Sequence, residues 1–157
     1  MTVRVGLGFD VHPFAVDARP LVFGGVVFEG ERGLQGHSDA DVVAHAVADA
    51  LLGAAGLGDI GMHFPDTDER IAGADSLRLL AEVVSMVGGA GWSIGNVDCS
   101  VVLEAPKLSP RRDEMQDVLG RVVGADVSVK GRRAEGLGAI GRGEGVACWA
   151  VAVLERP

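Results

Sequence analysis

The sequence has 157 residues, 48% of them hydrophobic and 23% charged, which is ordinary for a globular protein and fits one domain over residues 1–157. Its formal net charge of −8 argues against general nucleic-acid binding, which needs a basic surface, although cations gathered locally could still bind an anionic substrate. No apolar run reaches the roughly 18 residues of a membrane span, and the first residues lack the pattern of a signal peptide.

The first half of the chain predicts two β-strands followed by two helices. Residues 3–10 and 21–28 have the apolar patterns of strands. Residues 37–56 predict a helix that begins with a capping-box-like pair, Ser38 and Asp41. Residues 57–74 show neither helical nor strand periodicity, so we expect a long loop, and such loops in compact domains are usually functional. A second helix is predicted from Asp75 to about Val87 by its apolar spacing.

The second half of the chain predicts a strand, a helix and two further strands. Residues 92–106 alternate as a strand, and the next helix is expected to have Ser109 as its N-cap and Pro110 at its first position. Residues 126–131 and 146–155 predict the last strands, with a glycine-rich loop between them. This order of elements predicts an α+β fold, in which about three helices cover one face of a mixed β-sheet.

The two cysteines indicate a reducing compartment. Cys99 and Cys148 lie far apart in the sequence and lack the spacing of metal ligands. Reduced, buried thiols in a cytoplasmic protein fit this usage better than a disulfide framework does.

The segment "FDVHPF" carries an acid and an imidazole that could bind a metal. Side chains two residues apart on a strand leave the same face, so Asp10 and His12 can reach one point. His45 lies in the middle of an alanine-rich helix, where an imidazole needs a partner. These three side chains would form a set suited to Zn²⁺ with one open position, although Fe²⁺ or Mn²⁺ would accept the same ligands.

The metal hypothesis has a simpler alternative. His12 could be a surface histidine and His45 a core histidine bonded to a carbonyl, since short His and Asp patterns recur by accident. If a metal binds, Asp41 or Asp49, each one turn from His45, could orient the ring through its other nitrogen.

Two further segments indicate anion binding. His37 and Ser38 stand just before a helix whose first N–H groups are expected to be unpaired, although Ser38 could equally be a simple cap. The segment "KGRRAEGLGAIGRGEG" offers cations among six glycines, and its glutamate could hold Mg²⁺ beside phosphate oxygens, although its simpler interpretation is a turn between strands. Together with the metal hypothesis, these segments point to a substrate with several phosphates. The residues in question are Lys130, Arg132, Arg133, Glu135 and Arg142.

The order of several motifs resembles a known family. "GFDVH", "HSDADVVAHAVADALLGAAGLGDIG", "FPDTD", "GADS", "GNVDCSVVLEAPKLSP" and "GRGEG" follow one another over essentially the whole chain. They resemble the 2-C-methyl-D-erythritol 2,4-cyclodiphosphate synthase family. The resemblance implies a homotrimer around a threefold axis, with active sites between subunits. It also implies conversion of 4-diphosphocytidyl-2-C-methyl-D-erythritol 2-phosphate to the cyclic diphosphate and CMP.

The resemblance assigns roles to particular residues. Zn²⁺ would be held by Asp10, His12 and His45, and Mg²⁺ or Mn²⁺ by Glu135 with the substrate diphosphate. His37 and Arg133 stand at positions implied to stabilise the transition state. The positions implied to contact the substrate are Asp10, His12, His37, Ser38, Asp59, Ile60, Gly61, Phe64, Pro65, Asp66, Thr67, Asp68, Ser76, Ala105, Pro106, Lys107, Leu108, Arg132, Arg133, Ala134, Glu135, Ala139 and Arg142.

The sequence departs from the family pattern near its C-terminal end. Arg132 and Arg133 replace threonines that precede the Mg²⁺-binding glutamate in the family, Ala139 replaces a large apolar residue, and Trp149 replaces a glutamate expected to pair with Arg142. Two alternatives to cyclisation stay open: a phosphohydrolase that uses the same Zn²⁺ site to activate water, and a catalytically weakened trimer that binds phosphorylated isoprenoids, for which the replaced threonines would mark the lost catalysis.

Overall fold

A four-stranded mixed sheet forms the centre of the computed structural model, which describes residues 1–157 apart from the side chain of Arg70. The strand order is β1-β6-β4-β5; β4 and β5 are parallel and the other neighbours antiparallel, which confirms the predicted mixed sheet. The strands span Thr2–Pro13 (β1), Ser93–Val102 (β4), Asp126–Arg132 (β5) and Gly145–Arg156 (β6).

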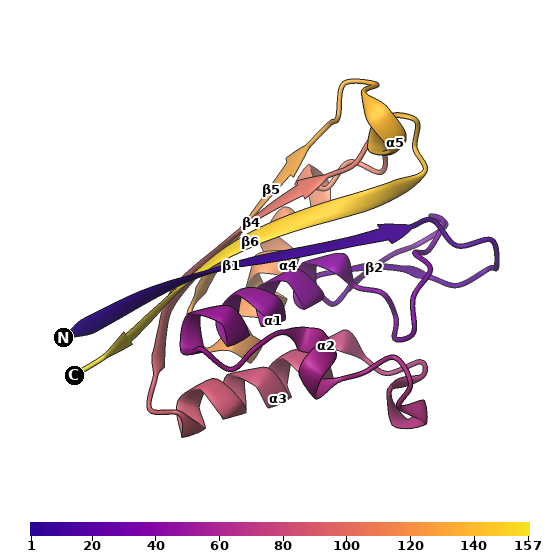
Figure 1. Cartoon of the computed structure of the whole chain (residues 1–157). Helices are drawn as coiled ribbons and strands as arrows, with labels where there is room; N and C mark the ends of the chain where they lie inside the picture. Colours follow the sequence, from indigo (N-terminus) through magenta and orange to yellow (C-terminus); the bar gives the residue numbers. More distant parts are fainter.

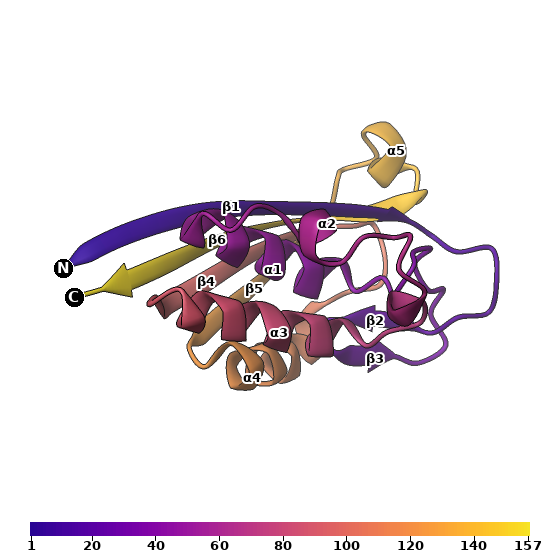
Figure 2. The same cartoon turned by 60° about the horizontal axis from the view of Figure 1, so that its bottom comes forward.

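Three helices cover one face of this sheet, as the sequence predicts (Figures 1 and 2). They are α1 (Val42–Ala55), α3 (Ser76–Gly89) and α4 (Arg112–Val123). Helix α1 lies against β1 at very short range, because β1 turns glycines toward it. A Cβ added to Gly8 would stand 2.0 Å from the carbonyl oxygen of Ala46.

The alternation along β1 is therefore the reverse of the usual one. Its small and polar residues face α1, while its large apolar residues face away from the helices. The outward side chains are Val3, Val5, Leu7, Phe9 and Val11, and Trp149 and Val151 of β6 add to the same exposed face. An apolar sheet face of this kind indicates contact with another surface.

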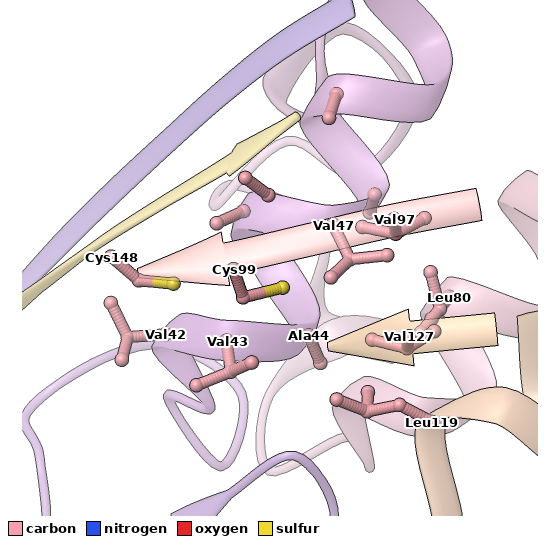
Figure 3. Packing of buried hydrophobic residues seen from close by; sticks show 14 of the residues in the cluster. Val42, Val43, Ala44, Val47, Leu80, Val97, Cys99, Leu119, Val127 and Cys148 are labelled. Carbon is pink, nitrogen blue, oxygen red and sulfur yellow. The ribbon is translucent and has the colours of Figure 1, made fainter. Parts of the chain in front are cut away.

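The core lies between the sheet and the helices (Figure 3). Cys99 and Cys148 are both buried there as free thiols beside Val42 and Val43 of α1, as expected from the sequence. Among the described residues, no helix has both the length and the apolar character needed to cross a membrane.

The predicted strand over 21–28 is wrong in one respect, because the structure divides it into a hairpin. Strands β2 (Leu21–Phe23) and β3 (Val26–Phe28) pair antiparallel across Gly24 and Gly25. Both glycines have φ in the left-handed region, at 56° and 75°, as a two-residue hairpin turn requires.

The loops contain short helical turns that the sequence analysis did not resolve. Helix α2 (Ile60–His63) and the 3₁₀ turn η1 (Glu69–Ile71) lie within the predicted loop 57–74. The glycine-rich loop contains α5 (Gly138–Gly141). The predicted N-cap at Ser109 is wrong, because Ser109 begins a 3₁₀ turn, η2 (Ser109–Arg111), without a side-chain cap.

The N-terminal cap of α1 also differs from the prediction. Asp41, not Ser38, is the N-cap, and its carboxylate accepts hydrogen bonds from the N–H groups of Val43 and Ala44. The same carboxylate accepts from Gly24 and Gly25, so it joins α1 to the hairpin turn. The N–H groups of Val43 and Ala44 are thus already paired, so the expectation that these helix-end groups stand open to an anion is wrong.

Candidate functional site

Asp10, His12 and His45 converge at the end of β1, as the sequence predicts. Oδ2 of Asp10 lies 2.9 Å from Nε2 of His12 and 3.0 Å from Nδ1 of His45, and the two nitrogens are 3.4 Å apart. Asp10 and His12 share one face because β1 continues to Pro13, and His45 comes from α1, the helix that packs against this face. All three ligand atoms lie within 4.8 Å of one another.

This geometry fits a small divalent cation. Ligands held about 2.0–2.1 Å from Zn²⁺ at tetrahedral angles are separated by about 3.3–3.4 Å; the two nitrogens match this at 3.4 Å, and the two distances to Asp10 are shorter, at 2.9 and 3.0 Å. The three side chains are each only partly exposed, at 24%, 18% and 13%, so a bound cation would keep access to the adjoining cavity. The donor set is two imidazoles and one carboxylate, which suits several divalent transition metals.

The remaining nitrogen of each imidazole is held by the protein. Nδ1–H of His12 donates to the carbonyl oxygen of Gln35 at 2.8 Å, so Nε2 is the nitrogen that faces Asp10. Nε2 of His45 lies 2.8 Å from Oγ of Ser76 and 3.1 Å from Oγ of Ser38. Two serines therefore orient His45.

The predicted orienting groups, Asp41 and Asp49, are wrong. Asp41 caps α1, as described above, and Asp49 accepts a hydrogen bond from the N–H of Ile60 at 3.4 Å. Ser76 was expected to contact substrate, but it is 1% exposed and lies behind His45.

The charges in the cluster favour a cation as well. Burial alone would raise the pKa of Asp10, but hydrogen bonds and positive charge from His12 and His45 outweigh it and lower the pKa to about 2. Burial would lower the pKa of His12, yet its hydrogen bond to Asp10 raises it overall. Asp10 is therefore an anion at neutral pH, ready to bind a cation.

A cavity of about 330 Å³ opens beside these three residues. It brings the cluster together with His37, Ser38 and part of the 57–74 segment. Of the predicted loop residues, Ile60, Phe64 and Asp66 line it; Asp59, Gly61, Pro65, Thr67 and Asp68 are not among its described lining residues. Its full lining is Asp10, His12, His37, Ser38, His45, Ile60, Phe64, Asp66, Ile71 and Leu79.

Sequence reasoning missed two apolar walls of this cavity. Ile71 belongs to η1, and Leu79 follows Ser76 by one helical turn on α3. The one available signal was Leu79, which stands three residues after Ser76, but an apolar residue at helical spacing is usually a core residue. Asp59 has another role, since its carboxylate caps α2 by accepting the N–H of Met62 at 2.9 Å.

A second, basic cavity of about 150 Å³ lies at the other edge of the sheet. Its lining includes four cationic side chains and one carboxylate, so it is positively charged. The carboxylate belongs to Glu104 and accepts the N–H of Ala134 at 2.8 Å. Of the predicted residues, Pro106, Lys107, Leu108, Arg132 and Arg133 line it, while Ala105 and Ala134 are not among its described lining residues. Sequence reasoning missed Leu103, Glu104, Ser109, Arg112 and Gly131.

The predicted residues beyond β5 lie outside both cavities as described. Glu135 is exposed, with φ of 54°, and is not part of the Asp10, His12 and His45 cluster. Nε of Arg142 donates to Glu144 at 2.6 Å. Trp149 packs on Phe9 with ring centroids 5.0 Å apart on the exposed sheet face.

The two cavities lie at the same end of the sheet but on opposite edges. The carboxyl ends of β1, β4 and β5 meet at this end, since Asp10 and Val101 both pair with Cys148 of β6 (Figure 1). β1 and β5 are separated by three strand spacings, roughly 14 Å.

This fold and this cluster define an α+β protein with two histidines and one carboxylate placed as candidate ligands of a divalent cation. Residues 3–155 match the YgbB family, and the chain belongs to that family.

Its relatives carry a more particular name. The chain is 56% identical to 2-C-methyl-D-erythritol 2,4-cyclodiphosphate synthase of Rubrobacter xylanophilus, covering 98% of this chain and 95% of that protein. The bifunctional IspDF from Campylobacter jejuni superposes with a TM-score of 0.95 at 40% identity, covering 99% of this chain and 43% of that one. The CDP complex of IspF from Plasmodium falciparum gives a TM-score of 0.85 at 32% identity, covering 98% and 96%.

Proposed function

We propose that this protein converts 4-diphosphocytidyl-2-C-methyl-D-erythritol 2-phosphate to 2-C-methyl-D-erythritol 2,4-cyclodiphosphate and CMP. The observation that carries the proposal is the convergence of Asp10, His12 and His45 beside a cavity, in a chain 56% identical to a synthase of that name. A phosphate oxygen of the substrate would attack the β-phosphorus, and the bond to the departing CMP would break. The nucleophile belongs to the substrate, so no nucleophilic side chain is needed.

The main task of such a site is to bring two anions together. Two unit charges about 4 Å apart repel by about 4 kcal/mol at an effective dielectric of about 20, and phosphates carry more than one charge each. Zn²⁺ held by Asp10, His12 and His45, and Mg²⁺ or Mn²⁺ held by Glu135 with the diphosphate, would supply positive charge against this repulsion.

The residues of the chain would position the reacting groups. His37 and Ser38, on the wall of the 330 Å³ cavity, would bind the attacking phosphate, and Ile60, Phe64 and Asp66 would enclose the methylerythritol. Holding the ring-closing pose could contribute several kcal/mol, up to about 7–11 in the best intramolecular cases. The same walls would keep water from attacking the β-phosphorus.

The basic cavity would bind the nucleotide end. Pro106, Lys107 and Leu108 would receive cytosine, and the CDP complex of a relative supports a cytidine ligand for this fold. Arg132 and Arg133 also line that cavity, at positions where the family pattern has threonines that bind the diphosphate. Ala139 and Arg142 complete the proposed set.

The 330 Å³ cavity of one subunit and the basic cavity of another would together form one active site between subunits. Within one chain the cavities lie at the β1 and β5 edges of the sheet, these two strands are roughly 14 Å apart, and a P–O–P bridge is much shorter. Packing the β1 edge of one copy beside the β5 edge of the next would close the gap and bury the exposed apolar face of β1 and β6. If this contact between unlike edges repeats three times and closes into a ring, it forms the homotrimer that the family resemblance implies.

Product analysis tests the proposal. Incubation with the cytidyl substrate and Mg²⁺ should release CMP together with the cyclic diphosphate, and a chelator should stop both. Open-chain phosphate with CMP would instead identify a phosphohydrolase. Absence of CMP would favour a catalytically weakened binding protein, to which the replacement of threonines by Arg132 and Arg133 lends support.

A cytoplasmic location is part of the proposal. The two buried free thiols support it, because reduced cysteines persist in that compartment.

A further inference from the structure

We propose that Ser76 and Asp39 are positioning residues for the cation site, acting on His45 through a hydrogen-bonded chain. The chain runs from the Asp39 carboxylate through the Ser76 hydroxyl to Nε2 of His45. It would fix the ring so that Nδ1 presents its lone pair to the cation. The inference rests on the proposed cation at Asp10, His12 and His45, but not on the reaction proposed above.

Ser76 is built into position behind His45. It is the first residue of α3, is 1% exposed, and places Oγ 2.8 Å from Nε2 of His45. Its hydroxyl also donates to Oδ1 of Asp39 in a short hydrogen bond, and its N–H donates to Oδ2 at 3.2 Å. Both oxygens of the Asp39 carboxylate therefore accept hydrogen bonds from Ser76.

The direction of these hydrogen bonds decides where the His45 proton lies. A hydroxyl has one proton, and that of Ser76 is directed to the Asp39 carboxylate, which can only accept. Toward His45, Oγ of Ser76 must then accept, so Nε2 carries the hydrogen. With the hydrogen on Nε2, Nδ1, 3.0 Å from Asp10 Oδ2, is the nitrogen that would present its lone pair to a bound cation.

Asp39 is itself held in place. Its N–H donates to the carbonyl oxygen of Ala74 at 3.1 Å, and Oδ1 also accepts the N–H of Asp41 at 3.1 Å. Beside it, the N–H of Gly73 donates to the carbonyl oxygen of His37 at 2.8 Å. The hydrogen bonds from Asp39 through Ser76 to His45 thus connect the start of α3 with the segment before α1, and both with the proposed cation site.

Metal affinity, measured without any substrate, tests the inference. The full-length zinc-loaded protein and its variants would be challenged with a chromogenic chelator, and the dissociation constant for Zn²⁺ obtained. Groups behind a metal-binding histidine typically change affinity 10- to 100-fold. We expect a loss in this range for Ser76→Ala and a smaller one for Asp39→Asn.

The double variant sharpens the test. If Asp39 acts through Ser76, Asp39→Asn should add little once the hydroxyl is gone, so the two losses should be clearly non-additive. Simple addition of the two losses would overturn the proposed chain.

Asp75 provides a matched control. Its carboxylate also accepts an N–H at the start of α3, from Leu77 at 2.8 Å, but it is exposed and does not reach Ser76 Oγ. Asp75→Asn should lower the melting temperature slightly and leave the affinity for Zn²⁺ unchanged. An equal loss of affinity in Asp75→Asn and Asp39→Asn would mean that the effect comes from the helix end alone.

A spectroscopic measurement separates positioning from general destabilisation. The chain has four histidines, so nitrogen resonances of their rings can be assigned in the zinc-loaded protein. We expect a slowly exchanging Nε2–H on His45 in the parent and faster exchange in Ser76→Ala. A Zn²⁺ affinity of Ser76→Ala within threefold of the parent, or unchanged Nε2–H exchange, would overturn the inference. A parent protein that binds no cation would contradict the proposed function first, and this inference with it.

Discussion

At the scale of single residues, Arg133 in the basic cavity is a clear departure from the family pattern, because it stands where that pattern has a threonine hydroxyl. Its side chain is exposed, and within the part of the chain that the structure describes it makes no hydrogen bond or ion pair. A guanidinium free to turn outward need not reach the diphosphate.

We therefore predict that Arg133→Thr has at least the turnover of the parent, measured as CMP released from the cytidyl substrate. Arg133→Ala is the matched control, since it removes the charge without supplying a hydroxyl, and it should be less active than Arg133→Thr. A hundredfold loss in Arg133→Thr would mean that Arg133 takes a direct part in catalysis.

The convergence of Asp10, His12 and His45 could be predicted from the sequence, but the groups that orient His45 could not. Asp10 and His12 follow from two-residue strand spacing, and His45 from an imidazole isolated among alanines. Ser76 could not be connected with His45, because the two lie on different helices and meet only where α1 and α3 pack together.

At the scale of elements, the Asp41 carboxylate joins α1 to the β2–β3 hairpin. It accepts four backbone N–H groups, two in the first turn of α1 and two in the hairpin turn, and it is fully buried. Removing it would leave buried donors without acceptors, which costs about 1–3 kcal/mol each where water cannot replace the lost partner.

Asp41→Ala should accordingly lower the free energy of unfolding by about 3 kcal/mol. Loss of the helix cap accounts for about 1 kcal/mol of this, and loss of the two hydrogen bonds to the hairpin turn for about 2 kcal/mol. Asp75→Ala, which removes an exposed cap on α3, should lower it by only about 1 kcal/mol. Denaturant titration of both variants measures the difference; equal losses would show that the hairpin contacts of Asp41 contribute nothing.

Element types follow from the sequence more reliably than element ends. The four sheet strands and three covering helices were all predicted, because each has a long apolar pattern. The hairpin at Gly24 and Gly25 was missed because apolar residues continue on both sides of the turn. The start of α1 was placed too early because two acids and a serine compete for the cap, and burial of Asp41 decides between them.

At the scale of the whole molecule, the exposed apolar face of β1 and β6 supports self-association. Leu7 lies at its centre, is 66% exposed, and pairs across the strands with Val151, which is 40% exposed. Turning glycines inward and large side chains outward makes sense only if a second surface covers the outer face.

We expect Leu7→Glu to convert the proposed trimer to monomer in sedimentation experiments, because a charge buried without a partner opposes assembly. Val16→Glu is the control: Val16 is 94% exposed but lies in a loop outside the sheet, so its variant should assemble like the parent. A trimer that persists in Leu7→Glu would exclude this face from the subunit interface.

The assembly itself was predicted only through the family resemblance. Alternation along residues 3–10 shows two different faces, but it does not say which one meets the helices. The inward turn of Gly6 and Gly8 settles that choice, and it depends on α1 packing closely, a contact between distant parts of the chain.

The most direct test of this account is the metal content of the parent and of His45→Ala, measured together with turnover on the same samples. Three ligands converging on one cation predict about one transition-metal ion per chain in the parent. His45→Ala should lose the ion and the release of CMP while sedimenting like the parent. A His45→Ala protein that keeps both the ion and normal turnover would contradict the account.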